Sequence, residues 1–142
     1  MSRSGDERPS WQQYGLALAD VAASRSEDPY RKVGAVVFRW DWSVLSVGYN
    51  GAPPGTEIPW DREARRDYVI HAEMNALRYA SRFEITNGFL CSTHQPCEKC
   101  LPMIAAYGLK AVYYREPYES TFGSDRLSII ADVLGLRMLK EP

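Results

Sequence analysis

The hydrophobic positions in the first half of the chain change from a helical period to short β-branched runs. Residues 10–26 place apolar side chains at helical spacing behind Ser10, a residue that favours a helix start. The apolar residues of this predicted helix are Trp11, Tyr14, Leu18, Val21 and Ala22. Two β-branched runs, residues 32–38 and 43–49, predict an antiparallel hairpin. Residues 50–61 are rich in glycine and proline and therefore predict a loop.

The second half of the chain alternates predicted helices and strands. We expect helices over about 71–82, 97–107 and 124–134, and strands over about 88–93, 110–114 and 136–139. Such alternation indicates an α/β fold with a largely parallel five-stranded sheet, covered on both faces, in which the first hairpin supplies one antiparallel pairing. A helix-length segment separates the fourth and fifth strands. It favours a parallel pair joined by a crossover helix.

The composition is that of an average globular domain, with 45% hydrophobic and 25% charged residues in a chain of 142. We expect residues 1–9 to be a disordered polar tail and residues 10–142 to form a single domain. No apolar run approaches the roughly 18 residues of a membrane span, and the first residues do not resemble a secretory signal. Three cysteines in such a chain indicate the reducing cytoplasm.

The charge pattern disfavours a polymeric anion as partner. The formal net charge is −1, and the most charged segment, residues 61–67 (DREARRD), is mixed in sign and forms no basic stripe. We therefore expect a small-molecule substrate, no nucleic-acid partner and no membrane partner.

Candidate chemistry lies in the segments HAEMNAL and THQPCEKC. Cys97 and Cys100 stand three apart at a predicted helix start, where they share one face and the helix dipole favours thiolates. In mid-helix, His71 and Glu73 would point about 200° apart, so they can serve one site only if His71 lies at the helix entrance. His71, Cys97 and Cys100 would then hold zinc with a fourth position open, which is typical of catalytic zinc. Glu73 would be the carboxylate that moves protons.

Other interpretations of these residues remain open at this point. The two cysteines of C-x-x-C could be a redox pair, and Cys91, His94, Cys97 and Cys100 could close a structural zinc site without His71. A lone histidine is often a hydrogen-bonded core residue. A glutamate in a first helical turn often only compensates the helix dipole.

The segments His71-Ala72-Glu73 and Pro96-Cys97-Glu98-Lys99-Cys100 match the H-x-E…P-C-x-x-C signature of zinc nucleobase deaminases. Together with SRSEDPYRKVGAVV and GYNGAPPG, they make the chain resemble the deoxycytidylate (dCMP) deaminases from about residue 12 to residue 139. The resemblance implies a three-layer α/β/α cytidine-deaminase-like fold with a mixed sheet. It also implies zinc-dependent hydrolysis of dCMP to dUMP and ammonia, with Glu73 as proton shuttle.

The resemblance also assigns substrate residues. Asn50 would reach the sugar and base, the backbone of Ala72 would bond the pyrimidine edge, and Ser24 and Arg25 would lie near the phosphate. Arg31 is another candidate for the phosphate. Three tyrosines could stack on the base or simply pack in the core, namely Tyr113, Tyr114 and Tyr118.

The loop GYNGAPPG resembles that of regulated family members, which implies that Tyr49, Gly51 and Pro53 serve a site for dCTP with Mg²⁺ as activator and for dTTP as inhibitor. The resemblance further implies a homo-oligomer, either a hexamer or a smaller assembly. Residues 51–70 contain neither cysteine nor histidine, so we expect one catalytic zinc per chain and no second, structural one.

Rival functions follow from the same motifs. The chain could deaminate another small base or nucleotide, or a tRNA adenosine, although the last would favour a basic surface. It could also be a catalytically silent zinc-binding regulatory subunit. The intact Glu73 argues against that alternative, because a structural zinc site has no use for it.

Overall fold

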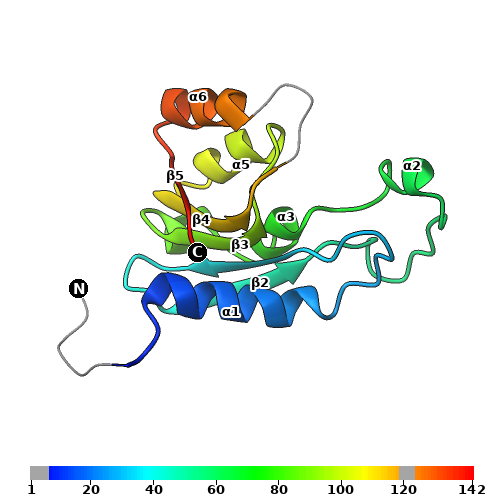
Figure 1. The fold of residues 1–142 in the computed structure, drawn as a ribbon, viewed down its shortest axis with the longest axis horizontal. Coiled ribbons are helices and arrows are strands. Elements are labelled where there is room, and N and C mark those ends of the chain that lie inside the picture. Colours follow the sequence, from blue (N-terminus) through cyan, green and yellow to red (C-terminus); the bar gives the residue numbers. More distant parts are fainter. Residues whose placement is uncertain (1–6, 119–123) are drawn as a thin grey trace.

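The computed structural model describes residues 7–118 and 124–142, and it contains one five-stranded sheet in the order β2-β1-β3-β4-β5 (Figure 1). The strands are β1 (Gly34–Phe38), β2 (Val44–Tyr49), β3 (Phe89–His94), β4 (Ala111–Glu116) and β5 (Arg137–Lys140). Strands β3, β4 and β5 are parallel, so the predicted mixed sheet and the parallel last pair are confirmed. The predicted antiparallel pairing of β1 with β2 is confirmed, and β1 also pairs antiparallel with β3, which the sequence did not predict.

The helices of the described residues are α1 (Trp11–Ala23), α2 (Arg62–Arg65), α3 (Ala72–Leu77), α4 (Arg82–Ile85), α5 (Cys100–Ala106) and α6 (Ser124–Leu134). The sequence did not predict α2 and α4, because four residues are too few to show a helical period. The predicted helix 71–82 ends early, with Arg78 as its C-cap. The predicted helix 97–107 begins late, at Cys100. The predicted disorder of residues 1–9 falls mostly on residues 1–6, which lie outside the described part.

Three layers are evident in Figure 1, with α1 against one face of the sheet and α3, α5 and α6 over the other. The side chains of β1 alternate between two cores, as expected for a strand. Ala35 and Val37 pack with α3 and α5, whereas Val36 and Phe38 pack with α1. The three-layer α/β/α architecture is therefore confirmed.

Helix α1 buries only part of the face that the sequence predicts: Ala22 is buried and Leu18 half-buried. Its buried residues are Gly15, Leu16, Ala19, Ala22 and Ala23, whereas Trp11, Tyr14 and Val21 are exposed. The helix lies so close to the sheet that a Cβ on Gly15 would overlap the Sγ atom of Cys91. Small residues are needed where the backbones approach this closely, whereas Trp11, Tyr14 and Val21 remain exposed.

Close packing of α1 on β1 gives a stability prediction. A Cβ on Gly34 would overlap the carbonyl oxygen of Ala19, and backbone atoms cannot move aside as a flexible side chain can. We expect Gly34→Val to lower the free energy of unfolding by about 3 kcal/mol, as measured by urea denaturation. Ala17→Val adds methyl groups to the exposed face of the same helix and should cost about 1 kcal/mol or less. Equal stability of the two variants would contradict the close approach.

The segment between β2 and α3 forms an arm that carries α2 away from the layers (Figure 1). At its base, Gly51 and Ile70 form an antiparallel bridge with N–O distances of 3.1 and 2.9 Å. Further out, the Tyr30 hydroxyl donates to the Trp60 carbonyl oxygen over 2.5 Å. These contacts tie the arm to the domain. Over residues 7–118 and 124–142, no helix has the length and apolar character needed to cross a membrane.

Candidate active site

His71, Cys97 and Cys100 form a cluster of possible metal ligands, and the described part of the chain holds no other group of three such residues. The Nδ1 atom of His71 lies 3.3 Å from Cys100 Sγ and 3.6 Å from Cys97 Sγ, and the two sulfurs are 3.6 Å apart. Tetrahedral zinc would place nitrogen and sulfur ligands about 3.5 Å apart and two sulfurs about 3.8 Å apart. The spacing of these atoms therefore fits zinc.

His71 lies at the helix entrance, as the sequence requires. It is the N-cap of α3, with extended backbone angles φ −66° and ψ 152°, and its side chain makes no capping hydrogen bond. The ring is therefore free to turn toward the cysteines. Cys97 lies in the turn before α5, where its carbonyl oxygen accepts from the backbone N–H of Cys100 over 3.1 Å. The prediction that Cys97 is itself helical is wrong, yet the turn keeps both sulfurs on one side.

The electrostatics of this triad suit a cation. A hydrogen bond from the Cys100 thiol, followed by one from His71, lowers the pKa of Cys97 to about 4. The pKa of Cys100 rises because it donates to Cys97 and is buried, and the pKa of His71 rises because of its hydrogen bond to Cys97. Cys97 is therefore the more acidic of the two thiols. A zinc ion would deprotonate both thiols and would leave one coordination position open.

Glu73 lies beside the triad without belonging to it. The residue is in the first turn of α3 and is only 4% exposed. Its Oε1 atom accepts a hydrogen bond of 3.2 Å from the hydroxyl of Ser92, on β3. Burial raises the pKa of the carboxyl above its ordinary value, and the positive charge of His71 opposes the rise. The site therefore has a buried carboxylate that can carry a proton.

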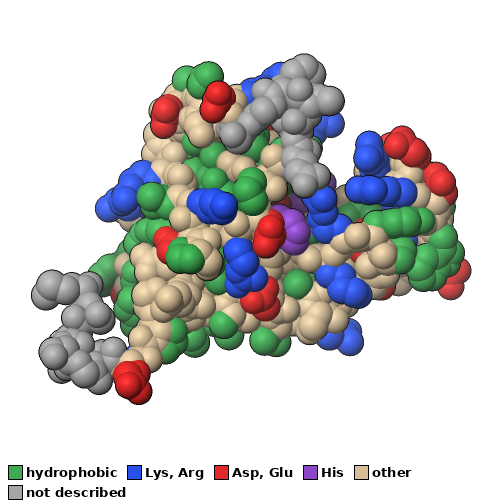
Figure 2. Space-filling view, viewed as in Figure 1, with side chains coloured by type: hydrophobic (Ala, Val, Ile, Leu, Met, Phe, Trp, Pro, Cys, Tyr) green, Lys and Arg blue, Asp and Glu red, His purple; other side chains and the backbone are tan. Residues whose placement is uncertain are grey.

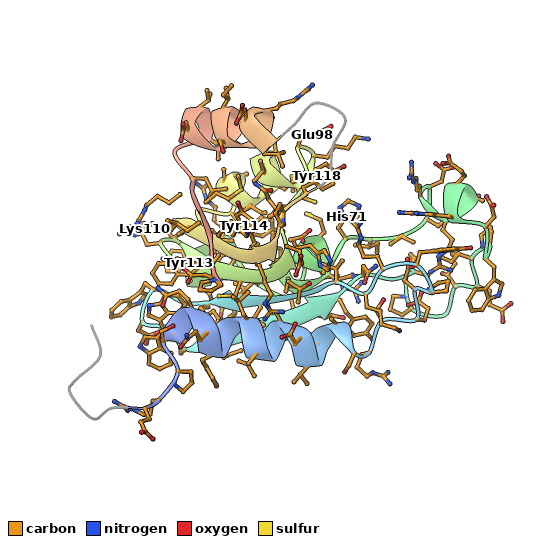
Figure 3. The ribbon with its side chains drawn as sticks, in the orientation of Figure 1. His71, Glu98, Lys110, Tyr113, Tyr114 and Tyr118 are labelled. Carbon is orange, nitrogen blue, oxygen red and sulfur yellow. The ribbon has the colours of Figure 1, made fainter. Side chains whose placement is uncertain are left out.

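The triad opens into a cavity of about 500 Å³ between the domain and the arm. Figure 2 shows this hollow, with lysine and arginine side chains on the part of the arm that faces it. Figure 3 shows His71, Glu98 and Tyr118 together at its inner side. Glu73 lines the same cavity. A volume of this size can hold a small organic ligand beside the metal site.

Two of the predicted substrate residues, Asn50 and Ala72, also line the cavity. The amide of Asn50 is fixed at both ends: Oδ1 accepts from the Val33 N–H and Nδ2 donates to the Arg31 carbonyl, each over 2.8 Å. Asn50 thus holds residues 31–33 against the cavity. These two hydrogen bonds are compatible with a contact to a ligand, because each end of the amide has hydrogen-bonding capacity left.

Ser24 and Arg25 are not brought to the cavity. Both side chains are exposed at the end of α1, where the Ser24 hydroxyl donates to the Val21 carbonyl over 2.5 Å. The alternative candidate, Arg31, does line the cavity. The residues predicted for regulation, Tyr49, Gly51 and Pro53, lie at or near the base of the arm. None of them lines the cavity.

The tyrosines divide between core and cavity. Tyr113 is buried on the α1 side of the sheet, with ring centroids 5.8 Å from Trp42 and 6.3 Å from Phe89. Tyr118 lines the cavity, and its backbone N–H donates to Gln95 Oε1 over 3.0 Å. Figure 3 shows Tyr113 and Tyr114 on the sheet, apart from His71. Of these three tyrosines, Tyr118 is the one that lines the cavity.

The local four-ligand zinc site is excluded for the described residues. Cys91 lies on the opposite face of the sheet from Cys97 and Cys100, in the core beneath α1, where burial raises its pKa to about 12. His94 interacts instead with the Thr93 hydroxyl, 2.8 Å from its Nδ1. Neither residue belongs to the ligand cluster.

The sequence did not predict Arg62, Arg65 and Arg66 as site residues, although all three line the cavity. Their signal was the segment DREARRD, which looks balanced because its acidic residues are counted with the basic ones. Folding separates the two kinds: Asp61 accepts from Ala64 N–H as the N-cap of α2, and Glu63 is exposed.

A three-ligand metal centre beside a buried carboxylate, on an α/β/α scaffold, is the architecture of a metal-dependent hydrolase. The family model described as the cytidine and deoxycytidylate deaminase zinc-binding region matches residues 9–116. The chain belongs to this family of zinc-dependent deaminases.

Within this family, the chain is similar to several deoxycytidylate deaminases. The chain is 39% identical over 129 residues to the deoxycytidylate deaminase of Mycobacterium phage D29, covering 80% of this chain and 98% of the relative. It is 31% identical over 118 residues to the human deoxycytidylate deaminase, covering 77% and 66%. The crystal structure of the dCMP deaminase of cyanophage S-TIM5 in complex with dCMP and dUMP superposes with a TM-score of 0.79 at 30% identity, over 96% of this chain and 100% of that one. A tRNA:A34 deaminase shares the fold alone, with a TM-score of 0.60 at 16% identity.

Proposed function

We propose that the protein is a zinc-dependent dCMP deaminase, which hydrolyses dCMP to dUMP and ammonia. The observation that carries the proposal is the arrangement of the His71, Cys97 and Cys100 triad and the buried Glu73 around one cavity. The similarity to the two phage dCMP deaminases, which extends over most of each chain, supports the choice of substrate. We expect one zinc ion per chain.

When bound, zinc supplies a water whose pKa falls to roughly 7. The chain's own contribution is the movement of protons by Glu73. Its carboxylate accepts one proton of the attacking water and delivers it to ring nitrogen N3. It then takes the remaining proton from the new C4 hydroxyl and transfers it to the leaving amino group. The bond from C4 to oxygen forms, the bond from C4 to nitrogen breaks, and ammonia leaves. Burial suits Glu73 to this role because a raised pKa eases protonation near neutral pH.

Ser92 holds the shuttle in position on this mechanism. Its hydroxyl donates to Oε1 of Glu73 and thereby fixes the orientation of the carboxylate. We expect Ser92→Ala to lower kcat about tenfold, because one buried hydrogen bond to a charged group is worth about 1.5–3 kcal/mol. Zinc content should not change. Ser43→Ala, which removes a hydroxyl from an exposed turn, is the matched control for steady-state kinetics. A normal kcat for Ser92→Ala would remove Ser92 from the mechanism.

Substrate binding would use the remaining cavity residues. We assign the backbone of Ala72 and the fixed amide of Asn50 to the base and sugar, and the ring of Tyr118 to stacking. Asn50 is well suited because its hydrogen bonds to residues 31–33 hold it in place before the ligand arrives, which lowers the entropy lost on binding.

The substrate assignment is tested by ammonia release from dCMP, CMP, dCTP, deoxycytidine and tRNA containing the target adenosine. We expect dCMP to be turned over and tRNA to remain unchanged. Hydrolysis of a different amine would keep the zinc chemistry and overturn the choice of substrate. Stoichiometric zinc without turnover of any substrate would instead support a silent regulatory subunit.

The proposal also covers the regulation, the assembly and the location of the enzyme. We propose activation by dCTP with Mg²⁺, inhibition by dTTP, a homo-oligomeric state and a cytoplasmic location. The three free thiols suit a reducing compartment. Repeating the dCMP assay with each effector tests regulation, and sedimentation velocity measures the assembly. Unaltered rates with dCTP and dTTP would remove the regulatory site at Tyr49, Gly51 and Pro53.

A further inference from the structure

The arm presents three arginines to the cavity, and only one of them, Arg65, is both buried and paired with carboxylates. Arg62 and Arg65 belong to α2, and Arg66 is its C-cap. All three line the cavity, and Arg31 lines it from the domain side. Figure 2 shows Lys and Arg side chains on both sides of the hollow. These arginines differ in whether carboxylates of the protein neutralise them.

Arg65 is used by the fold. It is only 4% exposed, its Nη1 donates to the Pro59 carbonyl over 3.2 Å, and its other nitrogens lie 3.6 Å from carboxylate oxygens of Glu27 and Asp28. Its Nε and Nη2 atoms are buried without a hydrogen-bond partner, so they act through charge alone. Arg65 thereby anchors the arm and neutralises the acidic residues beside the cavity.

Arg31, Arg62 and Arg66, which we call the basic rim, are not used in this way. Within residues 7–118 and 124–142, Arg31 and Arg62 make no ion pair with a carboxylate, and Arg66 makes one of 3.7 Å with the exposed Glu63. The guanidinium of Arg62 lies over the Tyr30 ring, 6.0 Å from its centroid. Arg62 and Arg66 are four residues apart along one helical turn, where like charges destabilise each other.

The charges that face the basic rim do not cancel it. Asp28 is paired with Arg65, and Glu73 is the buried proton carrier beside the metal triad. Glu98 is the remaining carboxylate of the cavity, and its neighbour Lys99 lines the cavity too. The hollow therefore has a surplus of positive charge opposite the triad, which a ligand with a dianionic group would balance.

We infer that the basic rim binds the 5′-phosphate of the substrate, so that α2 makes the enzyme specific for a nucleotide over a nucleoside. The inference rests on the proposed function. Guanidinium groups suit this task because they stay charged and form paired hydrogen bonds with phosphate oxygens. The arm brings Arg62 and Arg66 to the phosphate, and the hydrogen bond from the Tyr30 hydroxyl to the Trp60 carbonyl oxygen holds the arm in place.

The test compares dCMP with deoxycytidine in the zinc-loaded enzyme. We expect Arg62→Ala with Arg66→Ala to lower kcat/KM for dCMP about 100-fold and to change kcat/KM for deoxycytidine about twofold or less, because each charged hydrogen bond is worth about 1.5–3 kcal/mol. Lysine at both positions should restore part of the loss. Arg82→Ala, an exposed arginine of α4 outside the cavity, is the control.

Three results would overturn the inference: equal losses on both substrates, no loss on either, or a selective loss on dCMP in Arg25→Ala instead. Calorimetry with dUMP and deoxyuridine separates this inference from the proposed function. If the wild type turns over nothing but binds dUMP more tightly through Arg62 and Arg66, the basic rim stands and the deaminase assignment fails. If dUMP binds no more tightly than deoxyuridine, the basic rim is not a phosphate site.

Discussion

Glu73→Gln loses nearly all turnover of dCMP and keeps its zinc and its fold. The amide has the same shape as the carboxylate but cannot accept the proton of the attacking water. We therefore expect kcat to fall by about 10²–10⁴-fold or more, the range typical of general acid–base catalysis. The side chain is buried and outside the ligand triad, so that metal content and melting temperature should stay near those of the wild type.

Three measurements on one preparation check this result: initial rates, zinc content and thermal unfolding. Glu98→Gln is the matched control, because Glu98 lines the same cavity but is half-buried and has no part in the proton transfer. We expect it to lose less than about tenfold, the range of a single modest hydrogen bond. Retention of a tenth of the activity by Glu73→Gln would exclude Glu73 as the proton carrier.

Cys97→Ser loses zinc and becomes less stable. Serine is a poor zinc ligand, and the two remaining triad residues cannot hold the ion tightly. Since metal binding is coupled to folding, the variant should unfold at a lower temperature, by about 4 °C for each 1 kcal/mol lost. Chelation of the wild type should have the same effect, reversed by added zinc. Lower pH should also weaken binding, because protons compete for both thiolates and for His71.

Cys91→Ala is the matched control for the loss of a cysteine. Its thiol packs beneath α1 and is no ligand of the triad, so this variant should keep its zinc although it loses core packing. Zinc content by absorption spectrometry distinguishes the two variants directly. If Cys91→Ala lost the metal and Cys97→Ser kept it, the ligand set would be wrong.

The metal triad and the shuttle could be predicted because their geometry is local. Cys97 and Cys100 are joined by a single turn, and the two-residue spacing of His71 and Glu73 admits one common site only if the helix begins between them. The structure has that helix start. The parallel pairing of β4 and β5 was also predictable, because the length of their connection excludes a hairpin.

Features that depend on distant contacts could not be predicted. The buried face of α1 is set by how closely the helix approaches β1, and the large apolar residues in its sequence conceal that choice. The antiparallel pairing of β1 with β3 depends on where β3 enters the sheet. The hydrogen bond between Ser92 and Glu73 joins β3 to α3, which are distant in the sequence. The role of α2 depends on the pairing of Arg65 with acidic residues that lie far from it in the sequence.

The most direct test of the account is the conversion of dCMP by metal-free protein to which zinc is returned in steps. We predict that dUMP and ammonia form in equal amounts and that the rate rises with zinc until one ion is bound per chain. Protein that holds one zinc ion on His71, Cys97 and Cys100 and leaves dCMP unchanged would contradict the account.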